Sequence, residues 1–240
     1  MKTKYRFIQM LLLVGLLIFL FSFSSKRNQN RALGEINIEY TNGKDIFITE
    51  KNVNNLLIVK NQPYRKKSKD SLILNDLEEI LNQNPMIAKA EVYQTVTKDL
   101  GVKITQKEPL GRVMGKEVYY LDKQGGKMPL SSSFSARVPL LSGLDSIGIA
   151  EVYPLLKKIE KDDFFKKNIT GIHKEESGDY MLSLRGSKMK INFGQVEEID
   201  QKLMNFKAFY QKIYKDELLD KYSLVNLKFT NQVVSTKKEA

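Results

Sequence analysis

Hydrophobic and polar residues alternate near the end of the chain with the period of a half-buried β-strand. The apolar set is Val225, Leu227, Phe229 and Val233, and the polar set is Asn226, Lys228, Thr230 and Gln232. The pattern predicts one long strand over residues 225–236. A last strand is often an edge strand, and the backbone groups of an edge can pair with a partner.

The same reading of residues 35–108 predicts the order strand, helix, helix, strand, strand. Thr49 is predicted to cap the first helix. Asn75 is predicted to cap the second, because Glu78 follows at the capping-box spacing. Asn84-Pro85 should end that helix, since proline cannot continue it. The segment therefore reads as one compact α/β unit.

Short alternating segments separated by turns dominate residues 109–236 and predict an antiparallel sheet with helices, followed by a tail at 237–240. The clearest helix carries an apolar stripe formed by Val196, Ile199, Leu203, Phe206, Tyr210 and Ile213. The stripe is too short for a sustained coiled-coil seam, so a helix lying on a sheet explains it better.

Residues 7–25 contain no charged side chain. A helix of this length spans about 28 Å, close to the thickness of the hydrocarbon core of a bilayer. A transmembrane anchor fits better than a signal peptide cut near Ser22–Ser24, because the apolar stretch is longer than usual and Ala-x-Ala is missing. Residues 1–6 then form a short tail and residues 26–34 a linker. The predicted class is α+β, with a single N-terminal transmembrane helix.

Composition removes several kinds of chemistry. The chain has no cysteine, which excludes disulfides and thiolate sites, and its one histidine, His173, argues against a His-rich metal site. The acidic pairs Asp162-Asp163 and Glu175-Glu176 lie among lysines and are expected to be solvated. No residue pattern predicts a catalytic, cofactor or metal site. We therefore expect a protein that is not an enzyme and uses no cofactor.

The formal net charge of +11 favours anionic neighbours such as lipid headgroups or an acidic wall polymer. The basic residues are scattered along the chain, and tryptophan is absent. No arginine-rich groove is apparent, so nucleic acid is not an expected partner. A small-molecule substrate is not expected either.

Four runs of sequence resemble the bacterial cell-division family FtsQ, called DivIB in Gram-positive bacteria. They are LEEILNQNPMIAKAEVYQTVTKDLGVKITQKEPLGRV (77–113), YYLDKQGGKMPL (119–130), VPLLSGL (138–144) and VNLKFTNQVVSTKK (225–238). The closing run is most similar to Bacteroidetes-type members. In this family the strand-helix-helix-strand-strand unit is a POTRA (polypeptide-transport-associated) domain.

The resemblance implies a non-enzymatic scaffold of the divisome. It implies a single-pass type II protein of the inner membrane, with a cytoplasmic N-terminus, a periplasmic bulk and enrichment at the division septum. Its expected partners are the division proteins FtsB and FtsL, with other divisome members as a further group, and FtsB is expected to add a strand at the last strand.

The resemblance assigns specific residues to this expected edge. The expected partner-binding residues are Tyr222, Val225, Asn226, Lys228, Thr230, Gln232 and Val234. The expected core residues of the closing strand are Leu227, Phe229 and Val233. Two other functions remain open: a POTRA-type accessory protein for secretion or outer-membrane assembly, and a wall-active enzyme with a carboxylate pair in a cleft.

Overall fold

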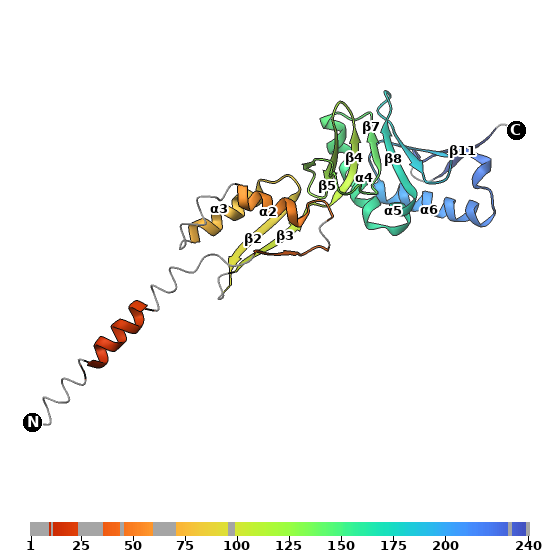
Figure 1. The fold of residues 1–240 in the computed structure, drawn as a ribbon. Coiled ribbons are helices and arrows are strands. Elements are labelled where there is room, and N and C mark those ends of the chain that lie inside the picture. The colour runs from red at the N-terminus through yellow and green to blue at the C-terminus, as the bar shows by residue number, and fades with distance from the viewer. Residues whose placement is uncertain are drawn as a thin grey trace, which may run out of the picture. The chain divides into compact units, whose positions relative to one another are not determined.

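The computed structural model describes residues 10, 12–23, 36–43, 46–59, 71–95, 99–229 and 232–238. The chain divides into two compact units, residues 1–106 and 107–240, and each is described by itself (Figure 1). Residues 12–23 are helical, and the rest of the predicted membrane segment lies largely outside the described residues, as do the predicted tail 1–6 and linker 26–34. Within the described ranges, no helix is long and apolar enough to span a membrane.

The first unit has the predicted order of strands and helices. Its elements are β1 (Ile36–Tyr40), α2 (Glu50–Val59), α3 (Ser71–Asn82), β2 (Ile87–Gln94) and β3 (Leu100–Gln106). The sheet order is β1-β3-β2, with β1 parallel and β2 antiparallel to β3. Both helices and all three strands contribute buried side chains to, or pack against, one apolar cluster.

One of the two predicted helix starts is wrong. Thr49 caps α2, since its hydroxyl accepts a hydrogen bond from the Asn52 N–H at 3.3 Å. In contrast, α3 already begins at Ser71, so Asn75 lies inside the helix rather than at its cap. Leu74 packs against the core of the unit, and this contact extends the apolar face of Leu77 and Leu81 one turn further toward the helix start.

The second unit is built on one nine-stranded sheet. Its elements are β4 (Pro109–Met114), β5 (Val118–Asp122), β6 (Lys127–Met128), β7 (Leu140–Ser142), α4 (Ser146–Lys161), α5 (Asp163–Asn168), β8 (Ile169–Lys174), β9 (Tyr180–Leu184), β10 (Lys190–Gly194), α6 (Ile199–Lys215), the 3₁₀ turn η2 (Leu219–Lys221), β11 (Tyr222–Asn226) and β12 (Val234–Lys237). The strand order is β12-β11-β10-β9-β8-β7-β4-β5-β6.

The predicted antiparallel sheet is wrong in part, because the sheet is mixed. The pairs β4–β7, β7–β8 and β10–β11 are parallel. Two of these pairs are explained by the helices between them: α4 and α5 connect β7 to β8, and α6 connects β10 to β11. Such a helical crossover carries the chain back to the end of the sheet where the first strand began, so the next strand runs parallel.

The apolar stripe of α6 packs on the sheet as predicted. Leu203, Phe206 and Ile213 are buried in the core of the second unit. Ile199 and Tyr210 are half-buried against the same cluster, which also holds side chains from α4, α5 and most of the strands. Val196 packs there too, but the prediction that it lies in this helix is wrong, because α6 begins at Ile199. The stripe therefore belongs to a helix on a sheet and not to a coiled-coil seam.

The predicted single closing strand is wrong, because the chain turns back and forms β11 and β12. The turn begins where the Asn226 side chain accepts a hydrogen bond from the Lys228 N–H at 2.9 Å. Leu227 is buried as predicted, at 1% exposure, whereas Phe229 is 49% exposed and is not a core residue. Thr230 lies outside the described residues.

A candidate partner-binding edge

β12 forms one end of the nine-stranded sheet (β11, its neighbour, is labelled in Figure 1). It pairs with β11 in antiparallel register, with Asn226 opposite Val234, Val225 opposite Ser235 and Leu224 opposite Thr236. No strand among the described residues pairs with its other side. The outer side of β12 is therefore the candidate partner-binding edge.

Two backbone hydrogen bonds show which backbone groups of β12 face outward. The Leu227 N–H donates to the Asn192 carbonyl of β10 at 2.8 Å, and the Lys238 N–H donates to the Lys221 carbonyl at 2.9 Å. Successive backbone groups of a strand point to opposite sides. The N–H and C=O groups of Val234 and Thr236 therefore face β11, as Lys238 does, and those of Ser235 and Lys237 face outward.

The strand behind this edge is held firmly. Val225 is fully buried, and Leu227 beside it is also in the core. The ring of Tyr222 meets Phe209 of α6 edge-on, with 5.5 Å between centroids. β11 is thus fastened to the core on one face. The burial of Val225 contradicts a direct contact between its side chain and a partner.

The other predicted partner-binding residues lie around the hairpin of β11 and β12. Asn226 is half-buried, Gln232 is exposed, and Val234 is 43% exposed. Lys228 is exposed and forms an ion pair with Asp179. Val233 is half-buried against the core, so its predicted packing role agrees with the structure.

Sequence reasoning missed Ser235 and Lys237, whose backbone groups face outward, because it treated 225–236 as one strand. The polar run Thr230-Asn231-Gln232 was the available signal, since asparagine is frequent in turns. A break in the strand at this run would have moved the predicted edge to Val234–Lys237.

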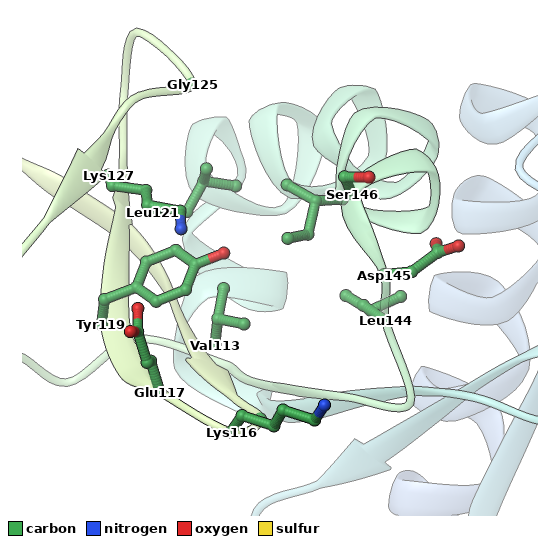
Figure 2. A pocket seen from close by; sticks show the side chains of 12 residues that line it. Val113, Lys116, Glu117, Tyr119, Leu121, Gly125, Lys127, Leu144, Asp145 and Ser146 are labelled. Atoms are coloured by element: carbon green, nitrogen blue, oxygen red, sulfur yellow. The ribbon is translucent and has the colours of Figure 1, made fainter.

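A separate cavity of about 510 Å³ lies elsewhere in the second unit (Figure 2). Figure 2 shows Tyr119 and Lys127 on one wall and Leu144, Asp145 and Ser146 on the other. The Asp145 carboxylate accepts a hydrogen bond from the Gly148 N–H at 2.7 Å and so caps α4. None of the predicted partner-binding residues lines this cavity.

The residues weighed for metal or acid–base chemistry have local roles. Asp162 caps α5, and its carboxylate lies 2.7 Å from the Lys207 ammonium. This ammonium, together with the N–H groups of Phe164 and Phe165, holds the pKa of the Asp162 carboxyl below its usual range, although burial acts in the opposite direction. The His173 ring shares a 2.9 Å hydrogen bond with the Ser142 hydroxyl. In the described part of the chain, no group of three or more histidine or acidic residues could hold a metal ion.

Two family models match the chain. Residues 108–236 match the model described as FtsQ/DivIB, C-terminal related, and this range is more than half of the chain. Residues 34–105 match the model described as a POTRA-like domain. A search of curated proteins gives no match. The boundary between the two matched ranges coincides with the boundary between the two units of the fold.

Proposed function

Since the chain belongs to the FtsQ/DivIB family, whose domains indicate a division-associated scaffold, we propose that it binds FtsB- or FtsL-type division proteins by strand addition at β12. The protein acts without catalysis. Residues 7–25 anchor it in the inner membrane, the N-terminus is cytoplasmic, and both folded units lie in the periplasm at the septum.

The observation that carries this proposal is the outer side of β12. It ends a nine-stranded sheet, and its inner neighbour β11 is fixed by Val225 and Leu227 in the core. A partner strand laid beside it would hydrogen-bond to the backbone of Ser235 and Lys237. Backbone bonds of this kind give affinity, and the side chains that alternate along the strand give register.

The side chains of β11 and β12 lie on the two faces of the sheet, on either side of where a partner strand would be added. Val234 and Thr236 lie in register with Asn226 and Leu224, so these four share one face of the sheet. Lys228 and Gln232 are exposed polar residues beside the two strands; the predicted partner-binding residue Thr230 lies outside the described residues. Tyr222 supports the strand from the α6 side.

The test is Ser235→Pro in the full chain, expressed in its native host after depletion of the wild-type protein. Proline removes the outward N–H but none that faces β11, and an edge strand tolerates it. The FtsB-type protein should no longer co-purify, cells should form filaments, and a fluorescent fusion should still report the protein at the envelope.

Ser235→Ala is the matched control, because it removes the hydroxyl and keeps the N–H. It should restore division and co-purification. If Ser235→Pro retained the FtsB-type protein and supported division as well as Ser235→Ala, strand addition at this edge would be wrong.

A further inference from the structure

The segment that follows β11 is tied to a turn two strands away. The Lys228 ammonium lies 2.9 Å from the Asp179 carboxylate, in the turn that precedes β9. The Asp179 side chain is only 16% exposed, whereas that of Lys228 is 46% exposed. The pair therefore joins an exposed part of the hairpin to a carboxylate that is partly shielded from water.

The end of β10 is shaped to receive Lys228. Gly194 has a φ of +69°, which disfavours any residue with a side chain. A Cβ built at Gly194 would lie 2.8 Å from Cγ of Lys228. The missing side chain thus leaves room for the stem of Lys228 to cross β10 and reach Asp179.

A buried ammonium supports this part of β10. Lys202 of α6 is 2% exposed. It donates hydrogen bonds to the carbonyls of Phe193, at 3.2 Å, and Gln195, at 2.9 Å, on either side of Gly194. Burying an ammonium is unfavourable unless it is hydrogen-bonded, so these two carbonyls account for its position.

The electrostatic surroundings of Lys202 lead back to the same carboxylate. Burial lowers the pKa of Lys202, and the carboxylates of Glu197, Glu198 and Asp179 act in the opposite direction. Asp179 therefore interacts with Lys202 as well as with Lys228. A single contact path runs from α6 through the end of β10 to the hairpin.

We propose that the Lys228–Asp179 ion pair positions the hairpin of β11 and β12 for strand addition, with Lys202 as a positioning residue beneath it. The inference rests on the proposed function, since it concerns the same edge. It adds a specific requirement: β12 accepts a strand only while residues 227–229 are held against the end of β10.

The test is a charge-reversal cycle in the full chain. Lys228→Glu places a second carboxylate beside Asp179, and Lys228→Glu with Asp179→Lys restores an opposite pair. Amide hydrogen exchange of the 232–238 segment should become roughly fivefold faster in the single variant, consistent with about 1 kcal/mol for such a pair. The double variant should return part of the way toward the wild-type rate, because Asp179→Lys also removes a carboxylate that favours the charged form of Lys202.

Lys158→Glu is the matched control. Lys158 pairs with Asp200 at 2.7 Å and has nearly the same side-chain exposure, 45%, but it lies on α4. Its reversal should leave exchange in 232–238 unchanged. Unchanged exchange in Lys228→Glu as well would overturn the inference without any reference to a partner.

Co-purification of the FtsB-type protein forms the second arm. Loss in Lys228→Glu and recovery in the double variant would support the inference. Normal co-purification with Lys228→Glu, together with loss in Ser235→Pro, would overturn the positioning role and leave the proposed function intact. Normal co-purification in both would instead reject strand addition at β12 itself.

Discussion

Both sheets have an edge strand whose outward backbone groups can be compared, β2 in the first unit and β12 in the second. The two edges differ in whether side chains occupy those groups. On β2, the Ala90 N–H donates to the Asn82 side chain at 2.7 Å, and the Ala90 carbonyl accepts from the same carboxamide at 3.4 Å. The Val92 N–H donates to the Glu78 carboxylate at 3.1 Å. On β12, the outward groups belong to Ser235 and Lys237, and no described strand covers them.

The difference shows that alternation alone does not decide whether an edge can accept a strand. The carboxamide of Asn82 makes with Ala90 the same two bonds that a residue of a neighbouring strand would make. Side chains at the end of α3 therefore close the edge of β2, one of the ways in which proteins protect exposed strands. The outward groups of β2 that these side chains occupy are therefore less available to a partner strand than those of β12.

The largest effect on stability is expected from truncating Leu227, which holds the chain beside β11 in the core. Leu227→Ala should lower the free energy of unfolding of the second unit by about 2–5 kcal/mol, since it leaves a cavity in the core. Phe229→Ala should change it by less than about 0.5 kcal/mol, because Phe229 is half exposed. Denaturant unfolding of both variants measures the contrast, and equal effects would contradict the assigned burial.

A smaller effect is expected beneath the same edge. Lys202→Met keeps the apolar stem but leaves the carbonyls of Phe193 and Gln195 without their donor. The second unit should lose about 1–3 kcal/mol of stability, the cost of unsatisfied buried polar groups. Chemical denaturation reports this loss, and a variant as stable as the wild type would mean that these two bonds are dispensable.

A still smaller loss of stability is expected when the backbone of β2 loses its side-chain partner. Asn82→Ala removes both bonds to Ala90 and should destabilise the first unit by about 1 kcal/mol, with faster amide exchange at Ala90. Asn82→Asp keeps an acceptor for the Ala90 N–H and should preserve much of its protection. If Ala90 exchanged at the wild-type rate in Asn82→Ala, the backbone of β2 would be protected by something other than this carboxamide.

The smallest effect is a pH dependence. The pKa of Lys202 is lowered in the folded chain, so the unfolded chain binds more protons between that lowered pKa and the ordinary value of 10.5. Stability should therefore rise with pH through this window relative to Lys202→Met, which lacks the group. Denaturant titrations of both proteins between neutral pH and pH 10 would show parallel curves if Lys202 kept its ordinary pKa.

Local patterns predicted much of this fold. The period of two identified the strands of the first unit, and the α6 stripe correctly predicted a helix on a sheet. The pattern failed where a distant contact decides. Val225, Leu227 and Phe229 look equivalent in an alternating run, yet the turn after Asn226 buries the first two and exposes the third.

The candidate site was less predictable than the fold. An edge near the last strand followed from strand order and family resemblance, but the outward residues depend on the register of β11 with β12. The burial of Lys202 could not be predicted from the sequence for another reason. It occupies a polar position in the α6 sequence, and only the carbonyls at the end of β10 explain its burial. Parallel pairing was missed because crossovers are set by packing rather than by the strands themselves.

The parallel pairing of β10 with β11 also bears on the order in which the second unit folds. Hairpins such as β8–β9 join residues close in sequence and can form early. β11 reaches β10 only after the whole of α6 has been placed, and pairings that close long loops are slow. We therefore expect the β12 edge to form late in folding. A partner that required this edge, as proposed above, would bind only chains whose second unit is already largely folded.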